Sequence, residues 1–566
     1  MIRLFREHSK RKVESLDGLW DFKVNGDKES ELPEEYNDNI YVPSVWEQKP
    51  GLESYRGKAY YKKELNVEQT GPVRLVFGGI SHTARIYLDG KKQKYHYDAY
   101  TPFEVIMEEL ESGEHILEIE VDNSFGPESA LHRESDYYTY GGITRPVEIQ
   151  YISELYIDRI YTVPNLKNDG TWELEIKIKL NNISDKKIVR NLILDLEEVQ
   201  KIDLGKVEVE AGEKTEIETK VDGLGVRPWS PEDPELYKIK AFLLNKGKVE
   251  DDKIDRIGFR EVEVEGRDIL INKEPVQLKG YNRHEDHPHF GCAIPVEAMM
   301  KDLEIMQDLG CNFVRTSHYP NDMRFLDLCD ELGFYVWEES HYRNVPLDHP
   351  QFKEQMETNT REMIDWHFNH PSLVLWGCLN ESESDTEFGR KIHKWLLELI
   401  KELDPDRPVT FASNSGQDDL CLEYVDVVSW NRYAAWYESS DPDYIKEALQ
   451  NDLDWLHSEE SNGGKDKPVI MSEFGAGALR GYREPHAAKW TEEYQEKVLD
   501  ESLKVYLNHP DIAGTAIWQF CDIRVTEGYF RGRPRTMNNK GTVDQYRRPK
   551  LAYDIVKKRM QEAENK

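Results

Sequence analysis

The stretch LVLWGCLNE, residues 373–381, is the clearest indication of how the second half of the chain folds. Its first seven residues are apolar or glycine, without the alternation of apolar and polar residues that marks a half-buried strand. A strand that is apolar on both faces is typical of a parallel sheet covered by helices. The stretch therefore predicts a fully buried strand that ends in a polar Asn-Glu pair.

Similar short apolar runs recur after Gly266 and alternate with segments of helical periodicity. We expect strands at residues 275–281, 312–317, 335–340, 373–381, 409–414, 427–433, 469–475 and 514–520, and helices at 296–310, 321–333, 387–404 and 492–507. Eight strand–helix units in roughly 300 residues predict a (β/α)8 TIM barrel over residues 264–566. A doubly wound sheet also alternates, but it seldom has eight units, and no GxGxxG opens this region.

The preceding part of the chain predicts two all-β domains. Residues 1–155 contain short runs of alternating apolar and polar residues, with a strong hairpin signal at Asp89-Gly90, and predict a jelly-roll-like sandwich. Residues 156–263 continue with some seven short strands, which fits an immunoglobulin-like β-sandwich. The predicted fold is therefore multidomain, with two β-sandwiches followed by the barrel.

The charge balance excludes several classes of partner. The 566 residues include 108 Asp and Glu against 74 Lys and Arg, which gives a formal net charge of −34. Such a field repels nucleic acid and anionic membranes, so neither is expected as a partner. No signal peptide is recognisable and no apolar run approaches about 18 residues, which predicts no membrane span.

Cysteine and histidine usage argues against a cofactor or metal. The six cysteines form no CxxC pair, which fits neither a disulfide framework nor a zinc ribbon and predicts a reduced, cytoplasmic compartment. No phosphate loop and no HExxH motif is present, and no cofactor is expected. His284, His287 and His289 could suggest a metal, but no carboxylate spacing supports one, and we expect them to line the rim of the barrel.

Two glutamates stand where a barrel of this kind builds its active site, at the carboxyl ends of the strands. Glu381 follows the fourth apolar strand and Glu473 follows the seventh, on opposed sides of the rim. Two carboxyl groups roughly 5 Å apart carry out retaining glycoside hydrolysis, one protonating the leaving oxygen and the other attacking the anomeric carbon. The alternative is that each glutamate only forms an ion pair with a rim arginine such as Arg315.

The chain resembles glycoside hydrolase family 2 along its whole length. The matching stretches are LDGLW, YTPFEV and YGGITRPVEI in the first domain, WSPEDPELY in the second, and GYNRHED, RTSHYP, WGCLNES, SEFG and IWQF in the barrel. The resemblance implies a sugar-binding first domain, a catalytic barrel and retention through a covalent glycosyl-enzyme. It implies Glu381 as acid/base, Glu473 as nucleophile and Asn380 as a hydrogen-bond partner of the sugar's 2-hydroxyl group.

The stretch RTMNNKGTVDQ, residues 535–545, follows the last strand and is expected to lie over the same rim. In an acidic protein, a carboxylated sugar needs a local cation, and a neighbouring amide supplies directional donors. Asn538 and Lys540, followed by glycine, resemble the uronate-binding motif of the family's β-glucuronidases.

The resemblance implies further pocket residues. In those β-glucuronidases an arginine stands four residues before the asparagine, where this chain has Pro534. Of its neighbours Arg533 and Arg535, we expect Arg535 to take that role, although either is possible. The remaining implied substrate-binding residues are Asp136 from the first domain and His318, Asn431, Tyr433, Tyr437 and Trp518 from the barrel.

The predicted function is exo-acting hydrolysis of β-D-glucuronides, with a small-molecule glucuronide or oligosaccharide as substrate. Alternatives within the family are β-galacturonidase and β-galactosidase; a galacturonide carries the same carboxylate and differs at one hydroxyl group. A carbohydrate-binding protein with an inactive barrel would require the loss of one carboxylate, and both are present. By analogy with the family we expect a homodimer or homotetramer.

Overall fold

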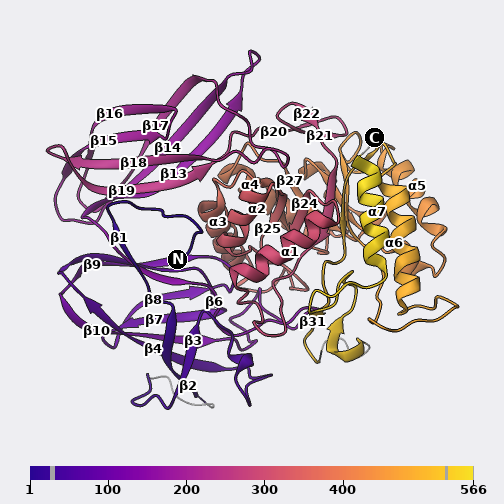
Figure 1. The fold of residues 1–566 in the computed structure, drawn as a ribbon, viewed down its shortest axis with the longest axis horizontal. Coiled ribbons are helices and arrows are strands. Elements are labelled where there is room, and N and C mark those ends of the chain that lie inside the picture. The colour runs from indigo at the N-terminus through magenta and orange to yellow at the C-terminus, as the bar shows by residue number, and fades with distance from the viewer. Residues whose placement is uncertain (26–31, 529–532, 565–566) are drawn as a thin grey trace.

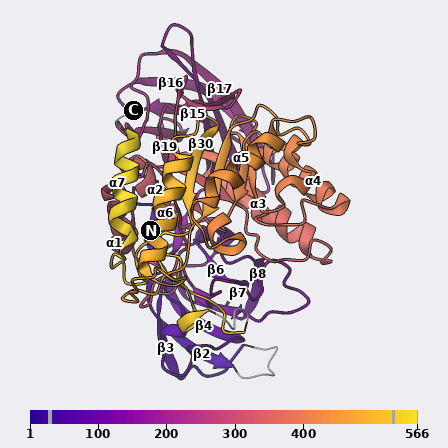
Figure 2. The same ribbon diagram turned by 90° about the vertical axis from the view of Figure 1, so that its right-hand side faces the viewer.

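The computed structural model describes residues 1–25, 32–528 and 533–564 and confirms the predicted fold class. Two β-sandwiches lie one above the other along one side of a closed eight-stranded barrel (Figure 1). The same stacking is visible after a quarter turn in Figure 2. Within the described ranges, none of the helices has the length and apolar character that crossing a membrane requires.

The first sandwich packs a six-stranded sheet against a four-stranded sheet. In spatial order the larger sheet contains β3 (Asp38–Val42), β2 (Gly18–Asn25), β4 (Lys58–Val67), β10 (Gly113–Asp122), β7 (Thr83–Leu88) and β8 (Lys91–Tyr97). The smaller contains β1 (Lys12–Ser15), β12 (Val147–Tyr151), β5 (Gly71–Phe77) and β9 (Phe103–Leu110), and β6 (Ile80–Ser81) pairs with β11 (Gly142–Ile143). The alternating sequence of β7 turns Ala84, Ile86 and Leu88 into the core between the sheets.

The second sandwich has seven strands, as predicted. One sheet contains β13 (Leu155–Leu166), β14 (Trp172–Asn182) and β17 (Lys214–Leu224), and the other contains β16 (Gln200–Val209), β15 (Ile188–Leu196), β18 (Tyr237–Asn245) and β19 (Lys248–Ile257). In β14, every second residue from Trp172 to Leu180 is buried while the intervening Glu and Lys residues are not fully buried. A small sheet of β20 (Val262–Glu265), β21 (Asp268–Ile271) and β22 (Glu274–Pro275) leads into the barrel.

The barrel closes through eight parallel strands. They are β23 (Leu278–Asn282), β24 (Phe313–Thr316), β25 (Tyr335–Glu339), β26 (Leu373–Cys378), β27 (Val409–Ser413), β28 (Val428–Asn431), β29 (Val469–Phe474) and β30 (Ile512–Ile517). All six residues of β26 are buried, as its continuous apolar sequence predicts. Its Asn-Glu pair therefore emerges at the carboxyl end of the barrel.

The helices follow the strands with one exception. They are α1 (Val296–Asp308), α2 (Met323–Leu332), α3 (Phe352–His367), α4 (Glu387–Leu403), α5 (Tyr444–Leu456), α6 (Glu492–Tyr506) and α7 (Ala552–Glu564). Between β27 and β28 the chain forms two short 3-10 turns instead of an α-helix, so the prediction of eight complete strand–helix units was wrong at this position. There the Asp419 side chain accepts hydrogen bonds from the Ser413 hydroxyl and the Cys421 backbone N–H. These side-chain hydrogen bonds take the place of the backbone hydrogen bonds of a helix.

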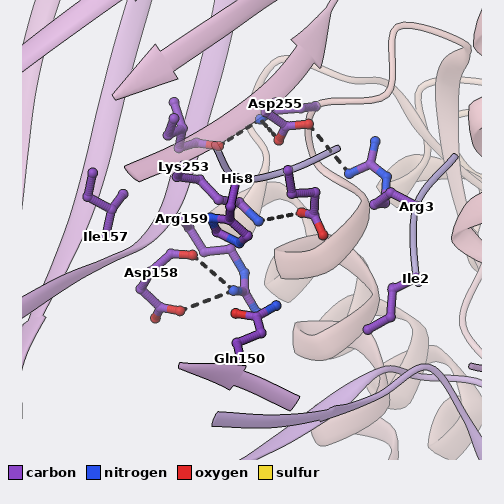
Figure 3. A network of polar contacts seen from close by, with 12 residues as sticks. Ile2, Arg3, His8, Gln150, Ile157, Asp158, Arg159, Lys253 and Asp255 are labelled. Carbon is purple, nitrogen blue, oxygen red and sulfur yellow. Dashed lines mark hydrogen bonds and ion pairs between the residues drawn. The ribbon is translucent and has the colours of Figure 1, made fainter. Parts of the chain in front are cut away.

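The N-terminal segment ties the domains together through buried charges. Arg3 donates to Asp327 on α2 at 2.8 Å and to Asp255 on β19 at 3.4 Å, and Lys253 on β19 pairs with Glu7. Figure 3 shows Arg3, Asp255 and Lys253 at this junction. Because these groups are withdrawn from water, removing one partner of a pair would leave the other charge buried and uncompensated, which would destabilise the fold.

Helix α3 lies where both sandwiches meet the barrel. Its Glu362 accepts a hydrogen bond from Thr101 of the first sandwich at 2.6 Å and contacts His96 at 2.9 Å. One turn further along, Asp365 pairs with Lys179 of the second sandwich at 3.2 Å. The orientation of the first sandwich, on which the site below depends, is therefore set by direct contacts with the barrel.

We expect Arg3→Met to lower the free energy of unfolding by about 3 kcal/mol, because Asp327 stays buried without its main partner. The loss should lie at the low end of the range for broken buried pairs, since Arg256 also lies 3.2 Å from Asp327. Urea unfolding measures the change. Lys12→Met, which removes an exposed pair with Glu14, is the matched control and should have no measurable effect. Equal effects of the two substitutions would contradict a structural role for Arg3.

Candidate active site

Polar side chains from four barrel strands form one cluster at the carboxyl end of the barrel. Arg315 belongs to β24, Asn380 and Glu381 follow β26, Asn431 ends β28, and Glu473 belongs to β29. All are buried except Glu381, which is partly accessible. The structure thus brings together the two glutamates and the two amides that the sequence singled out.

Glu473 is held at both carboxylate oxygens. Arg315 donates to Oε1 at 3.0 Å, and the Tyr433 hydroxyl donates to Oε2 at 2.8 Å. Burial, and after it the negative charge of Glu381, raise the pKa of Glu473 to about 7, against the opposing effect of Arg315. The carboxylate is therefore fixed in direction but costly to ionise while Glu381 is charged.

Glu381 lies in a different environment. Its backbone has a left-handed conformation, with φ of 47°, which is rare for a residue with a side chain and is typical of functional positions. Asn431 donates to Oε1 at 3.0 Å, and Arg343 forms an ion pair with Oε2. Burial alone would raise the pKa of Glu381, but Arg343 and Asn431 lower it below its ordinary value.

The amides connect the two carboxylates. Asn431 donates to Asn380 Oδ1 at 3.1 Å, and Arg315 donates to the same oxygen at 2.9 Å while it holds Glu473. Glu381 and Glu473 therefore face one space through shared neighbours. Each affects the other's proton affinity, since the charge of Glu381 is among the causes that raise the pKa of Glu473.

Lys540 is not a solvated cation. Only 2% of the residue is exposed, and Nζ lies 4.4 Å from the ring centre of Tyr433 and 4.7 Å from that of Tyr437. Nζ donates to the Tyr437 hydroxyl at 2.8 Å. Burial lowers the pKa of Lys540, and the cation–π contacts partly replace its lost water.

Several buried amide atoms at this end of the barrel have no partner among the described residues. They are the oxygen and the nitrogen of the fully buried Asn538 side chain, and Asn380 Nδ2. An unpaired buried polar group costs about 1–3 kcal/mol, so such groups are retained where a ligand completes them. Together with Lys540, these unpaired amide atoms are candidates for binding the oxygen atoms of a ligand.

The first sandwich contributes Asp136 to the same space. Arg343 donates to its two oxygens at 3.1 and 3.3 Å, and Asp136 is buried. Burial opposes ionisation, but Arg343 holds the pKa of Asp136 far below its ordinary value. The neighbouring Tyr137 donates from its hydroxyl to His341 of the barrel at 2.8 Å, with the His341 ring nitrogen taken as acceptor, which anchors this loop over the rim.

The other predicted pocket residues lie beside this cluster. The rings of His318 and Trp518 stack with centres 5.0 Å apart, and His318 Nδ1 lies 2.9 Å from Glu339. Tyr437 is 63% exposed, so its ring forms part of the entrance. His284 is buried against Trp518, whereas His289 is exposed beside Tyr546.

The arginines differ from the expectation. Arg535 is exposed and is not brought to the cluster, whereas Arg533 is close enough for its charge to lower the pKa values of Asp136 and Tyr437. Arg343 was not expected at all. Its position shortly after the third barrel strand is the signal that could have identified it, because that end of a strand faces the site.

A hollow of about 920 Å³ lies elsewhere, between the second sandwich and α3. Its lining mixes lysines with acidic residues around an apolar floor that includes Tyr161 and Phe368. It contains neither Glu381 nor Glu473. The presence of a sizeable hollow therefore does not by itself locate the catalytic residues of this protein.

Family models match almost the whole chain. The sugar-binding domain of the glycosyl hydrolases family 2 matches residues 13–152, the central domain of that family matches 155–260, and its TIM barrel domain matches 262–565. A curated β-glucuronidase from Streptococcus agalactiae is 27% identical, over 97% of this chain and 96% of its own length.

Solved structures are similar over the same length. A family 2 β-galacturonidase from Eisenbergiella tayi bound to galacturonate is 44% identical, with a TM-score of 0.94 and 99% of both chains covered. A Bacteroides uniformis β-glucuronidase 2 covalently bound to cyclophellitol-6-carboxylate aziridine is 25% identical, with a TM-score of 0.85 over 97% of this chain and 69% of that chain.

We expect Asn538→Leu to stabilise the empty protein by about 1 kcal/mol, because an apolar side chain of similar shape removes two unpaired buried polar atoms. Thermal unfolding without ligand measures the change. Asn282→Leu is the matched control: Asn282 is equally buried but donates to the Ser472 and Ala516 carbonyls at 2.7 and 3.0 Å, so its replacement should destabilise. A destabilising effect at Asn538 would mean that its amide is already satisfied in the empty protein.

Proposed function

Because this chain belongs to the glycosyl hydrolases family 2 and is therefore a glycoside hydrolase, we propose that it is an exo-acting, retaining β-uronidase that prefers β-D-galacturonides. The observation that carries recognition of a uronide is the buried Lys540, two residues after Asn538, whose buried amide has no partner among the described residues. A cation withdrawn from water in a protein of net charge −34 is a binding site for an anionic group, and a uronate carboxylate supplies one.

Glu473 acts as the nucleophile in this proposal. Its carboxylate attacks the anomeric carbon, the bond to the leaving oxygen breaks, and Glu381 gives its proton to that oxygen. Arg315 and Tyr433, each bonded to one oxygen of Glu473, direct the attack. Water then cleaves the glycosyl-enzyme, with Glu381 taking the proton from the water and returning to its starting form.

The remaining residues hold the sugar. Lys540 and Asn538 bind the carboxylate, and we assign the assisting role to Arg533, whose charge reaches Asp136 and Tyr437, rather than to the exposed Arg535. Asn380 donates its free Nδ2 to the 2-hydroxyl group, a hydrogen bond that strengthens in the transition state. Asp136, His318, Asn431, Tyr437 and Trp518 complete the pocket.

Two uronides carry the carboxylate that Lys540 would bind, and different relatives support each of them. The solved relative from Eisenbergiella tayi, at 44% identity, is a β-galacturonidase, which supports galacturonide as the preferred sugar. The curated β-glucuronidase relatives, at 26–28% identity, support glucuronide, which the sequence predicted first, as the second candidate. Both sugars carry the same carboxylate, so the role of Lys540 is common to the two.

The cellular compartment and the oligomeric state of the enzyme are proposals that come from the sequence. The structure pairs none of the six cysteines in a disulfide among the described residues, which supports a reduced, cytoplasmic environment. Assembly into a homodimer or homotetramer rests on the family alone.

We expect Glu473→Ala to abolish turnover while the fold is retained, because the residue lies at the rim and its removal relieves the repulsion with Glu381. Hydrolysis of p-nitrophenyl β-D-galacturonide and far-ultraviolet circular dichroism measure the two quantities. Substantial activity in a correctly folded variant would exclude Glu473 as the nucleophile.

Lys540→Met should lower kcat/KM for uronides by about 10- to 150-fold, since it removes a charge-assisted contact worth roughly 1.5–3 kcal/mol. Rates on p-nitrophenyl β-D-galacturonide, β-D-glucuronide and β-D-galactoside test this together with the substrate. We expect the wild type to be fastest on the galacturonide, and the variant to lose activity on both uronides but not on any galactoside. Preference of the wild type for the galactoside would reject uronide recognition.

A further inference from the structure

Arg343 lies between carboxylates of two domains. Its Nε and Nη2 contact the two oxygens of Asp136 at 3.1 and 3.3 Å, and its Nη1 forms an ion pair with Glu381 Oε2. The arginine comes from the loop after β25, next to Asn344, whose φ of 56° is left-handed. One guanidinium therefore serves the first sandwich and the barrel at once.

In this arrangement the protonation states of Glu381 and Glu473 are the reverse of those that the proposed reaction needs. The contact with Arg343 favours an ionised Glu381, whereas the proposed acid must carry a proton. The pKa of Glu473 is raised to about 7, by burial first and by the charge of Glu381 second, whereas the proposed nucleophile must be ionised. Below about pH 7 the pair thus carries one proton, and the ion pair of Arg343 with Glu381 favours its placement on Glu473 in the empty site.

Arg343 also competes with the leaving oxygen for Glu381. Each Glu381 oxygen already accepts a hydrogen bond, Oε1 from the Asn431 amide and Oε2 from Arg343. A glycosidic oxygen has to approach one of these atoms to receive a proton. Arg343 is the partner that can withdraw, because its two contacts with Asp136 hold the guanidinium after the third is broken.

We propose that Arg343 is a positioning residue that decides which of the two catalytic carboxyl groups holds their shared proton. With the site empty it pairs with Glu381 and leaves the proton on Glu473. When a sugar enters, Arg343 withdraws to Asp136, Glu381 gains a proton and Glu473 loses one, so that no net proton is taken up. This inference rests on the proposed roles of the two glutamates.

The surroundings of Glu381 allow this exchange. Among the residues that the structure describes, the titratable and charged groups facing it are Arg343 after β25, Asp136 from the first sandwich, Glu473 on β29, Tyr433 after β28 and His318 after β24. Burial and the charges of Arg315 and Arg343 keep the pKa of His318 well below its ordinary value, so His318 does not supply a second positive charge there. Once Glu381 is neutral, its charge no longer raises the pKa of Glu473, and Arg315 remains to stabilise the nucleophile.

The pH dependence of kcat/KM, which reports the free enzyme, tests the proposal. The wild type should lose activity as the pH rises through about 7, where the last proton of the pair dissociates. In Arg343→Gln the removal of a cation raises the pKa of Glu381 most, so this basic limb should move upward by about 1–3 pH units. Arg343→Lys keeps the charge and should keep the limb near its wild-type position.

A purely structural role for Arg343 would lower kcat/KM equally at every pH and leave the limb unmoved, which would overturn the proposal. If Arg343→Gln does not fold, a crystal structure of the wild type with bound uronic acid decides instead. Arg343 Nη1 should then lie more than about 4 Å from Glu381, beyond ion-pair distance, and an intact pair would refute the exchange. Activity of Glu473→Ala would reject the proposed function itself, whereas an unmoved limb with inactive Glu473→Ala rejects only this inference.

Discussion

The catalytic end of the barrel depends on a single buried guanidinium, that of Arg315. It is fully inaccessible and donates to Glu339 at 2.9 Å through each of two nitrogens, to Asn282 at 2.8 Å, to Asn380 at 2.9 Å and to Glu473 at 3.0 Å. These partners come from or directly follow β23, β25, β26 and β29, while Arg315 itself belongs to β24. Because a buried arginine is tolerated only with its donors satisfied, the five strand ends are held in one geometry.

The second constraint is that the site is shared between domains. The barrel alone supplies the two glutamates, but Asp136 arrives on a loop of the first sandwich. Its partner Arg343 belongs to a barrel loop, and so does Lys540, whose pKa is lowered by burial, an effect that the charge of Asp136 opposes. Contacts far from the chemistry, at the N-terminal segment and along α3, decide whether that loop reaches the rim. The contacts at the domain junction therefore affect the charge state of the active site through the position of Asp136, although the junction and the active site are formed by different residues.

Much of this arrangement follows from patterns in the sequence. The uninterrupted apolar runs predict buried parallel strands, and the residues that end them, Glu381 and Glu473, necessarily meet at one rim. The absence of a helix after β27 could not be predicted from the alternation of strands and helices, because hydrophobic periodicity does not reveal the hydrogen bonds that the Asp419 side chain makes there. Nor could the sequence reveal that Lys540 is enclosed by aromatic rings or that Arg343 bridges two carboxylates. Both depend on loops whose conformations arise from tertiary packing, and for the same reason Arg533 and Arg535 could not be separated.

The most direct measurement is to trap the glycosyl-enzyme. A cyclophellitol-type carboxylate aziridine, the class of compound covalently bound in the Bacteroides uniformis relative, reacts with the nucleophile of a retaining enzyme. Incubation with the galacturonate-configured compound, followed by peptide mass spectrometry, should find one label, on Glu473, with complete loss of activity. A label on Glu381, or full activity with no label in an enzyme that still cleaves uronides, would contradict the account.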